Sequence, residues 1–358
     1  MPDIQVESLV KQFGAQRALD DVSFDVREGE LFTLLGPSGC GKSTTLMSIA
    51  GFQTPEEGRI AVGGDVFFDA SRRVGVPAER RNLGIVFQSY AVWPHMTVFQ
   101  NLAFPLKVRR TKRATIRERV HEVLELVEMG GYADRYPHQL SGGQQKRVAL
   151  ARALVYSPSV LLLDEPFSNL DAKLRERARA WVKELQSKLG LTTIFVTHDQ
   201  DEALSMSDRV AVMSSGEVQQ IATPEEIYRR PSNRFVAEFV GRVNLLSGRV
   251  AAAERGRVAL ELADGRKLWV DTEHKAAPDA KLTLAVRPEA LRVEDAETST
   301  LNGTNTLDAQ IDSVAFLGDH YQYELRAGSV SLTAQTSRPV GTQNVRVHIP
   351  ADACAIVE

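Results

Sequence analysis

One nine-residue stretch constrains the fold of this chain more than any other feature of its sequence. It reads Gly36-Pro37-Ser38-Gly39-Cys40-Gly41-Lys42-Ser43-Thr44 and fits the pattern G-x-x-x-x-G-K-S/T. An apolar run at 31–35 precedes it, and a run compatible with a helix follows at 45–50. Glycines let successive backbone N–H groups converge on phosphate oxygens, and the dipole of the following helix adds positive potential. The stretch therefore predicts a strand, a phosphate-binding loop and a helix in an α/β fold.

The side chains of this loop predict what it holds. Lys42 is expected to reach the β- and γ-phosphates of ATP, and the Ser43 hydroxyl to ligate Mg²⁺. The thiol of Cys40 is expected to be a bystander. The residues of the loop expected to contact the nucleotide are Gly36, Ser38, Gly39, Cys40, Gly41, Lys42, Ser43 and Thr44. A glycine turn that carries Gly-Lys-Ser by coincidence is the alternative.

A pair of carboxylates predicts the hydrolytic centre. Asp164 and Glu165 directly follow the apolar run Val160–Leu163, which is typical of a strand buried on both faces of a parallel sheet. Ligands bind at the carboxyl ends of such strands. We expect Asp164 to hold Mg²⁺ and Glu165 to polarise the attacking water. An ordinary surface pair of carboxylates is the alternative.

A second candidate for anion binding lies at the start of a predicted helix. The run Leu140-Ser141-Gly142-Gly143-Gln144 offers a hydroxyl and open backbone amides at a helix N-terminus. The same residues also form an ordinary helix-entry turn. Taken by themselves, they favour that turn.

Hydrophobic periodicity predicts the elements of the first two thirds of the chain. A stripe at helical spacing indicates that the segment at about 90–155 is helical, and it comprises Ile116, Val120, Val123, Leu124 and Val127. The basic run before this stripe is expected to be a solvated face, and it comprises Lys107, Arg109, Arg110, Lys112 and Arg113. Strand-like and helix-like runs then alternate up to residue 240, with a helix expected to end before Gly190. This alternation is typical of a parallel sheet with crossover helices.

The hydrophobic pattern changes from helix-like to strand-like after Gly241. Residues 258–270 alternate around Asp264-Gly265 and predict a β-hairpin, and further strands are expected within 282–293 and 307–325. We therefore expect an α/β domain at 1–240 and a small all-β barrel at 241–358.

Composition limits the class of partner. The formal net charge is -3 and the charged residues are 43 basic and 46 acidic, which counts against nucleic acid as the main partner. The two cysteines lie far apart in the chain, without metal-ligand spacing, which favours a reduced, cytoplasmic compartment. The first residues carry neither a basic nor an apolar signal segment, and no apolar run approaches the length that spans a bilayer. Any pore would have to come from other chains.

Together these motifs resemble the ATP-binding cassette (ABC) superfamily, whose signature LSGGQ stands here at 140–144. Other elements of the family occur in order at Gln88 before Ser89-Tyr90, at Ser168-Asn169-Leu170-Asp171 and at Thr197-His198-Asp199. Phe13 matches the aromatic residue that stacks on adenine. The resemblance covers residues 1–240 and implies a P-loop NTPase (RecA-like) cassette with a helical subdomain at about 90–155.

The resemblance also implies a mechanism. Two chains would form a head-to-tail homodimer in which each Lys42 loop faces Ser141, Gly142, Gly143 and Gln144 of the partner chain, with Asp171 also at the nucleotide. It implies that Glu165 is the general base and that His198 contacts the γ-phosphate. Gln88 would join the Mg²⁺ shell to the contact with the membrane subunit.

Shorter motifs indicate a branch of the family. Residues Tyr90–Met96 resemble the stretch that receives the permease of bacterial importers. Residues 230–241 and Arg287-Pro288-Glu289 are similar to the junction and OB-type TOBE domain of sugar, polyamine and ferric-iron importer ATPases. This implies a permease and a solute-binding protein as partners, and a peripheral location at the cytoplasmic face of the plasma membrane. The texture around Trp93 and Arg287 leans toward iron(III) or polyamine rather than sugar.

Two other functions are the alternatives. A soluble cassette protein acting on DNA or ribosomes usually has two cassettes or a long inserted coiled coil, for which the spacing between Lys42 and Ser141 leaves no room. An exporter ATPase usually has fused membrane helices, and a barrel after Gly241 would be unusual there.

Overall fold

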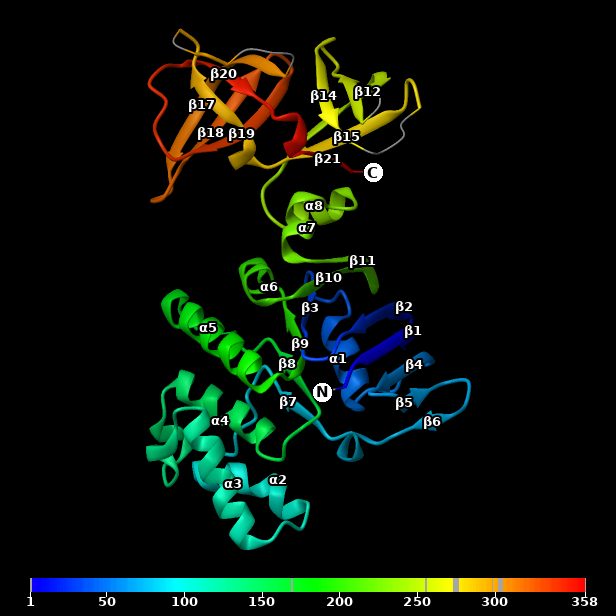
Figure 1. Cartoon of the computed structure of the whole chain (residues 1–358), viewed down its shortest axis with the longest axis vertical. Coiled ribbons are helices and arrows are strands. Elements are labelled where there is room, and N and C mark those ends of the chain that lie inside the picture. Colours follow the sequence, from blue (N-terminus) through cyan, green and yellow to red (C-terminus); the bar gives the residue numbers. More distant parts are fainter. Residues whose placement is uncertain are drawn as a thin grey trace. The chain divides into compact units, whose positions relative to one another are not determined.

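A computed structural model describes residues 2–168, 170–254, 256–272, 277–297, 299–301 and 305–357. Asn169, which belongs to one of the motifs above, lies outside the described residues. The chain divides into two compact units, Met1–Pro224 and Glu225–Glu358. Figure 1 shows the first unit with mixed helices and strands and the second dominated by strands.

The first unit contains two sheets. Antiparallel strands form a five-stranded sheet in the order β2-β1-β4-β5-β6, and a six-stranded sheet has the order β11-β10-β3-β9-β8-β7. In the second sheet every neighbouring pair is parallel except β10 and β11. The strands of this unit are β1 (Ile4–Phe13), β2 (Gln16–Val26), β3 (Leu31–Leu35), β4 (Glu57–Val62), β5 (Asp65–Asp69), β6 (Val74–Gly75), β7 (Leu83–Val86), β8 (Val160–Asp164), β9 (Thr192–Thr197), β10 (Arg209–Ser214) and β11 (Glu217–Ala222). The expected parallel sheet is confirmed.

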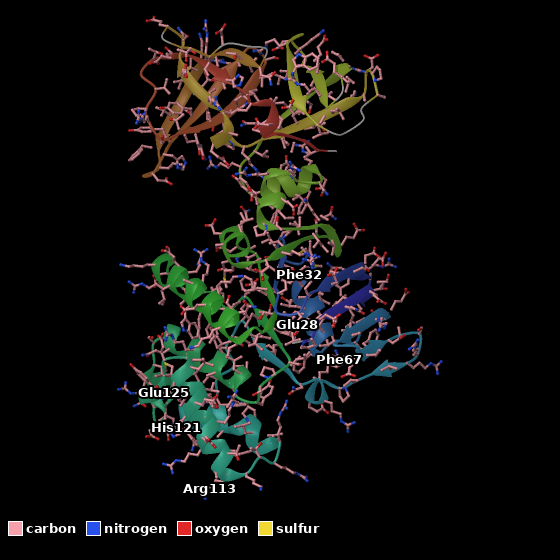
Figure 2. The ribbon with its side chains drawn as sticks, viewed as in Figure 1. Glu28, Phe32, Phe67, Arg113, His121 and Glu125 are labelled. Atoms are coloured by element: carbon pink, nitrogen blue, oxygen red, sulfur yellow. The ribbon has the colours of Figure 1, made fainter. Side chains whose placement is uncertain are left out.

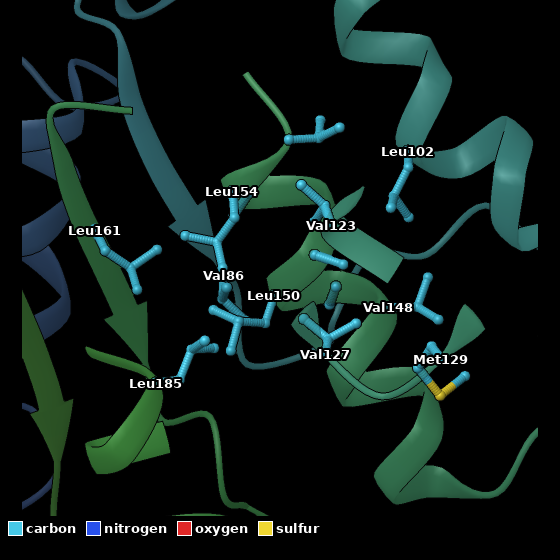
Figure 3. Close-up of a cluster of buried hydrophobic side chains, with 14 of the residues drawn as sticks. Val86, Leu102, Val123, Val127, Met129, Val148, Leu150, Leu154, Leu161 and Leu185 are labelled. Carbon is cyan, nitrogen blue, oxygen red and sulfur yellow. The ribbon is translucent and has the colours of Figure 1, made fainter. Parts of the chain in front are cut away.

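The parallel sheet is buried on both faces, as the apolar run at 160–163 predicts. Val160 and Leu162 belong to one hydrophobic cluster, together with α1 and strands of the antiparallel sheet. Leu161 and Leu163 belong to another cluster, which joins the sheet to the helices. This alternation follows from the period of two along a strand. Figure 3 shows Leu161, Val86 and Leu185 facing the side chains of the helical layer.

The helices of the first unit are α1 (Lys42–Ala50), α2 (Val98–Val108), α3 (Arg113–Leu126), α4 (Gly142–Leu154), α5 (Ala172–Leu189) and α6 (Gln200–Met206), with short 3-10 helices at Ala78–Arg80, Gly130–Tyr132 and Pro137–Gln139. The stripe Ile116, Val120, Val123, Leu124 and Val127 is buried, as expected. Gly190 ends α5 with φ 62, the left-handed conformation expected of a glycine at that place. Among the described residues, no helix has both the length and the apolar character needed to cross a bilayer.

The basic run between α2 and α3 is solvated. Lys107, Arg109, Arg110, Lys112 and Arg113 are all exposed. Figure 2 shows Arg113 at the outer end of α3. The expectation that these charges form a solvated face is confirmed.

In the described residues of the second unit, strands are accompanied by two short helices and two 3-10 helices. Its elements are α7 (Pro224–Arg229), α8 (Arg234–Phe239), β12 (Asn244–Glu254), β13 (Arg257–Glu261), β14 (Lys267–Asp271), β15 (Lys281–Val286), the 3-10 helix Pro288–Ala290, β16 (Arg292–Asp295), β17 (Thr306–Phe316), β18 (Tyr321–Ala327), β19 (Val330–Thr336), β20 (Asn344–His348), the 3-10 helix Ala351–Ala353 and β21 (Cys354–Val357). Two five-stranded sheets, β14-β13-β12-β15-β21 and β16-β20-β17-β18-β19, share one hydrophobic core. The hairpin around Asp264-Gly265 is confirmed by the pairing of β13 with β14.

The segment 282–293 contains strands, as expected, with a break between them. β15 ends at Val286, a 3-10 helix follows, and β16 belongs to the other sheet. The break falls at Pro288, which has no N–H to donate to a ladder. This turn carries the chain from one sheet to the other.

The boundary between the units also differs from residue 240. The second unit begins at Glu225. Within it, Ala237 of α8 packs against Ala285 of β15 and Val357 of β21. Arg287 makes this attachment: its guanidinium donates to the backbone carbonyls of Tyr228, Ala237, Gly241 and Arg242 at 3.0–3.2 Å. The same guanidinium carbon lies 4.1 Å from the centre of the Tyr228 ring. Burial lowers the pKa of Arg287, so the attachment depends on these contacts to compensate a desolvated charge.

Replacing Arg287 by methionine is expected to destabilise the second unit by about 3 kcal/mol, because several backbone carbonyls lose a charged donor. In calorimetric unfolding of the whole chain, the transition of the second unit should occur at a lower temperature in Arg287→Met than in the unaltered chain. The matched control is Arg292→Met, at an exposed position on β16, which should shift the same transition by no more than about 0.5 kcal/mol. Equal shifts in the two variants would contradict the role given to Arg287.

Candidate active site

The loop between β3 and α1 encloses the Lys42 ammonium. Only 5% of Lys42 is exposed, and its Nζ donates to the carbonyls of Gly36 at 2.7 Å and Pro37 at 2.8 Å. Cys40 is buried as well, with its Sγ 3.7 Å from the same ammonium. The loop thus holds a charged donor that is already desolvated. A phosphate oxygen can replace the two carbonyls without a further large cost of dehydration.

The glycines of this loop have separate structural reasons. Gly41, at the start of α1, has φ 105, and a Cβ there would meet the Ala18 carbonyl oxygen at 2.6 Å. Gly39 has φ 81, and nothing lies within 4 Å of the place a Cβ would take. Gly41 therefore permits close packing against Ala18, whereas Gly39 leaves open space beside exposed Ser38. These features suit a loop whose amides face a phosphate.

Asp164 ends β8 next to the first turn of α1. The Ser43 hydroxyl donates to Asp164 Oδ1 at 2.9 Å. Burial raises the pKa of the Asp164 carboxyl and the neighbouring Glu165 carboxylate raises it further, whereas the Ser43 hydrogen bond and the Lys42 charge lower it. A hydroxyl and a carboxylate at this distance are oxygen donors of the kind that Mg²⁺ prefers, so the pair fits the ion.

Glu165 occupies an unusual backbone conformation. Its φ of 45 lies in the left-handed region, which glutamate rarely adopts. Its N–H donates to the Val196 carbonyl at 3.0 Å, and its own carbonyl accepts from the Ser168 N–H at 3.2 Å. These bonds hold the turn that takes the chain out of β8.

The Glu165 side chain joins two residues from distant segments. Gln88 Nε2 donates to its Oε2 at 2.9 Å, and His198 Nδ1 lies 3.0 Å from its Oε1. The side chain of Glu165 is 20% exposed and that of His198 is 57% exposed, so solvent reaches the pair. Sequence reasoning proposed all three residues, and the fold brings them together with Asp164 and Ser43. A carboxylate in this setting can accept a proton from water.

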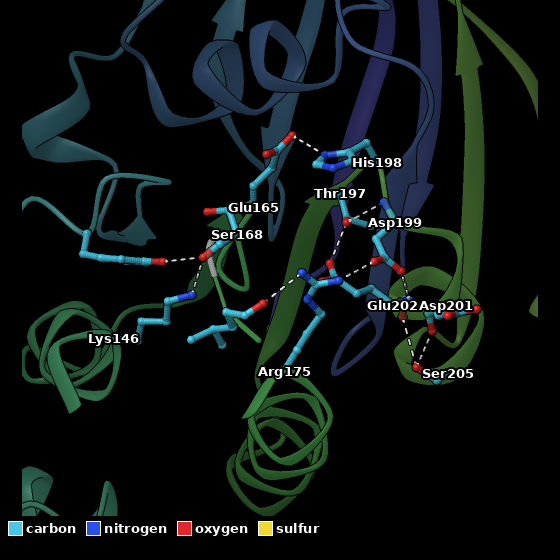
Figure 4. A network of polar contacts seen from close by, with 12 residues as sticks. Lys146, Glu165, Ser168, Arg175, Thr197, His198, Asp199, Asp201, Glu202 and Ser205 are labelled. Atoms are coloured by element: carbon cyan, nitrogen blue, oxygen red, sulfur yellow. Dashed lines mark hydrogen bonds and ion pairs between the residues drawn. The ribbon is translucent and has the colours of Figure 1, made fainter. Parts of the chain in front are cut away.

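A polar network fixes the residues on either side of His198, and sequence reasoning missed it. Thr197 donates to Glu202 at 2.6 Å, and Asp199 caps α6. Arg175 of α5 donates to Asp199 at 3.2 Å and to the Leu170 carbonyl at 3.0 Å (Figure 4). Burial raises the pKa of Glu202. The spacing from Asp199 to Glu202 is a helix-start signal that could have been noticed, but no pattern points to Arg175.

The signature residues are not part of this cluster. Ser141 caps α4: its hydroxyl accepts from the Gln144 N–H at 3.3 Å, while its N–H donates to the Gln144 side chain at 2.9 Å. Gly142 is exposed, with nothing within 4 Å of a Cβ position, and a Cβ on Gly143 would meet only Leu174. No hydrogen bond among the described residues joins this helix entrance to the Lys42 loop. Within one chain, Ser141–Gln144 therefore form an open capped turn.

Two further predicted residues lie outside the cluster. Phe13 ends β1 with 48% of its surface exposed, and its ring centre is 5.3 Å from the Lys11 ammonium. Asp171 is exposed and caps α5 by accepting from the Leu174 N–H at 2.9 Å. The stacking of Phe13 on adenine and the contact of Asp171 with nucleotide remain predictions.

The segment Tyr90–Met96 is held by side chains of α2 and α4. Asn101 of α2 is fully buried and bonds the backbone of Trp93 and Met96, and Arg152 of α4 donates to the Tyr90 carbonyl at 3.1 Å. The Trp93 ring lies 4.6 Å from both the Arg152 guanidinium and the Phe104 ring centre. An open groove of about 500 Å³ adjoins the segment, and its lining includes Phe52, Phe87, Ala91, Trp93, Phe104 and Val108. Three of these residues, Phe52, Phe104 and Val108, are large exposed apolar side chains.

Comparison with known families and proteins gives consistent matches. Residues 19–168 match the ABC transporter family, and residues 284–357 match the TOBE domain. The chain is 48% identical over 326 residues to the spermidine/putrescine import ATP-binding protein PotA of Rubrobacter xylanophilus, covering 90% of this chain and 83% of that protein. It is 41% identical over 338 residues to the Fe(3+) ions import ATP-binding protein FbpC of Fusobacterium nucleatum, covering 94% and 87%.

Solved structures are similar to part of the chain. The dimeric structure of MJ0796, a bacterial ABC transporter cassette, matches with a TM-score of 0.54 and 32% identity, over 62% of this chain and 98% of that one. The structure of cbiO1 from Clostridium perfringens, part of the ABC transporter complex cbiONQ, matches with a TM-score of 0.57 and 34% identity, over 63% and 89%.

Proposed function

The chain belongs to the ATP-binding cassette (ABC) transporter family and is the ATP-hydrolysing subunit of an importer, and we propose that closure of its ATP-loaded homodimer drives uptake of a polyamine or of ferric iron through a separate permease. The observation that carries the catalytic assignment is the Glu165 carboxylate, held between Gln88 and His198 next to the pair formed by Ser43 and Asp164.

Each residue of the cluster has a role in hydrolysis. The Lys42 ammonium exchanges the carbonyls of Gly36 and Pro37 for the β- and γ-phosphate oxygens of ATP. Glu165 accepts a proton from the attacking water, and His198 contacts the γ-phosphate. Ser43, Asp164 and Gln88 would hold Mg²⁺. The bound ion supplies charge neutralisation on the phosphates.

The nucleotide site is completed by a second copy of the chain. Ser141, Gly142, Gly143 and Gln144 form an open helix entrance, which suits the γ-phosphate held by the partner's loop. Exposed Phe13 would stack on adenine, and exposed Asp171 would lie at the same interface. The dimeric arrangement of the cassette similar to this chain supports the proposal.

Replacing Ser141 by arginine is expected to leave ATP binding within about twofold but to lower hydrolysis by about 10²-fold or more, because a long side chain blocks the approach of the partner's phosphate. Nucleotide affinity and steady-state ATPase activity of the assembled transporter measure the two effects. Ser141→Ala is the matched control, since it removes the same helix cap without adding bulk.

Mixing Ser141→Arg with Lys42→Ala chains sharpens this prediction. One composite site of the heterodimer keeps both intact elements, and the other has neither. ATP-dependent dimerisation should recover in part relative to either variant alone. Normal hydrolysis by Ser141→Arg in the assembled transporter would show that the site is not shared between chains.

The permease contact is proposed at the segment Tyr90–Met96. This segment is hydrogen-bonded to Asn101 and Arg152, and it borders an apolar groove with exposed Phe52, Phe104 and Val108. Exposed apolar patches of this kind mark interaction sites. The chain would then lie peripherally at the cytoplasmic face of the plasma membrane, with a solute-binding protein at the other face. We propose no nucleic-acid partner. The similar proteins are named import ATP-binding proteins, which favours an importer over an exporter ATPase or a soluble cassette protein.

The solute class is tested in liposomes that contain the chain with its permease. The solute-binding protein loaded with spermidine, putrescine or Fe³⁺ is added from outside, and ATP hydrolysis is followed inside. One of these solutes should raise hydrolysis above the unloaded protein. A transporter that hydrolyses ATP but responds to none of the three would contradict the solute class, and one without hydrolysis would contradict the catalytic assignment.

A further inference from the structure

One backbone carbonyl receives two side chains from separate segments of the first unit. The Ser168 carbonyl accepts from the Tyr90 hydroxyl at 2.9 Å and from the Lys146 ammonium at 2.7 Å. Figure 4 shows the Lys146 side chain reaching Ser168 just beyond Glu165. The Ser168 hydroxyl itself is buried without a partner among the described residues. The contact is therefore made to the main chain, which any residue at this position would offer.

The two donors also contact each other. The Lys146 ammonium lies 4.7 Å from the centre of the Tyr90 ring, within the range of a cation–π interaction. Burial lowers the pKa of Lys146 to about 8, with Glu202 opposing and Arg175 adding to that shift. Burial also raises the pKa of the Tyr90 hydroxyl. The Lys146 ammonium is desolvated and is stabilised by one carbonyl and one aromatic ring. It therefore loses much of its stabilising interaction energy if either partner moves away.

The three residues connect regions that have different tasks. Tyr90 begins the segment proposed to meet the permease. Lys146 lies in α4, shortly after the helix entrance that is proposed to meet the partner's phosphate. Ser168 follows Glu165, and its own N–H donates to the Glu165 carbonyl at 3.2 Å. The backbone of one residue, Ser168, thus lies between both docking segments and the backbone of the general base, with its carbonyl on one side and its N–H on the other.

We propose that Lys146 and Tyr90 are positioning residues that transmit permease docking to the backbone around Glu165 through the Ser168 carbonyl. The inference rests on the proposed function. A displacement of the segment 90–96 must either carry the carbonyl with it or break a charge-assisted hydrogen bond. Discrete contact changes of this kind can couple two sites. The proposed coupling is separate from nucleotide binding, because among the described residues neither Lys146 nor Tyr90 makes a side-chain hydrogen bond to the Lys42 loop.

The test compares Lys146→Met and Tyr90→Phe with the unaltered chain, each purified alone and with the permease. Methionine keeps an unbranched stem but removes the charge, and phenylalanine keeps the ring but removes the donor. ATP hydrolysis by Lys146→Met without the permease should stay within about threefold of the unaltered chain, with the KM for ATP within about twofold. Stimulation by the permease should fall by about fivefold or more in both variants, the range of a typical coupling between sites.

Hydrogen exchange gives a readout that a purely structural role would not move. In the unaltered chain, permease binding should change the exchange of the peptide that spans 160–175. In Lys146→Met the same peptide should not respond, although the melting temperature of the free chain changes little. The matched control is Lys183→Met, which removes a lysine of α5 that pairs with Asp208 at 2.9 Å. This control should keep full stimulation.

The outcomes separate two failures. If the permease does not stimulate the unaltered chain, the proposed function is overturned and the inference with it. If the unaltered chain is stimulated and either Lys146→Met or Tyr90→Phe retains full stimulation, the inference alone is overturned. Loss of stimulation in Lys183→Met would also overturn it, because the effect would then not be specific to the Ser168 carbonyl.

Discussion

Replacing Glu165 by glutamine is expected to lower the kcat of ATP hydrolysis by about 10²–10⁴-fold while ATP affinity stays within about twofold. The amide can still occupy the space between Gln88 and His198, where the carboxylate now lies 2.9 Å and 3.0 Å from their nitrogens. It cannot accept a proton from water. The variant should therefore accumulate as a closed dimer with ATP bound, which size-exclusion chromatography with Mg²⁺-ATP would detect.

The control for this variant is Glu176→Gln, the same chemical change at an exposed position of α5. It should hydrolyse ATP at the normal rate. Turnover of Glu165→Gln within about twofold of the unaltered chain would show that another group accepts the proton, since general-base catalysis contributes far more than that.

Replacing Lys42 by methionine is expected to lower kcat/KM for ATP by about 10²-fold or more. The ammonium is almost fully buried and is held by two carbonyls of its own loop, so it is poised for an acceptor that enters the same space. The phosphate oxygens are charged in the ground state, and the ammonium also stabilises the charge that develops on the transferring phosphoryl group in the transition state. Both ATP affinity and kcat should therefore fall, as equilibrium binding and steady-state kinetics would measure.

Methionine keeps most of the buried volume, so the effect should not come from unfolding. Lys188→Met, at an exposed position in the last turn of α5, is the matched control and should behave normally. Unchanged nucleotide affinity in Lys42→Met would place the phosphate site elsewhere in the chain.

Much of the nucleotide-binding unit could be predicted from local patterns. The loop at 36–44, the carboxylates at 164–165 and the glycine after α5 each depend on consecutive residues, whose backbone geometry is set locally. The apolar run at 160–163 has the alternating two-sided burial expected of a central parallel strand. Local patterns do not reveal that α7 and α8 belong to the second unit. Their backbone carbonyls are bound by Arg287, a side chain more than forty positions later in the sequence.

The sequence by itself therefore determined the α/β cassette, the nucleotide loop, the carboxylate pair and the all-β second unit. Only the tertiary structure decided the left-handed backbone of Glu165, the network around Arg175 and the junction at Ser168. One physical reason is that each of these features includes a contact to a backbone carbonyl, those of Val196, Leu170 and Ser168, and every residue carries such a group. A carbonyl leaves no mark in a sequence, so its partner becomes visible only when the folded chain brings a donor to it.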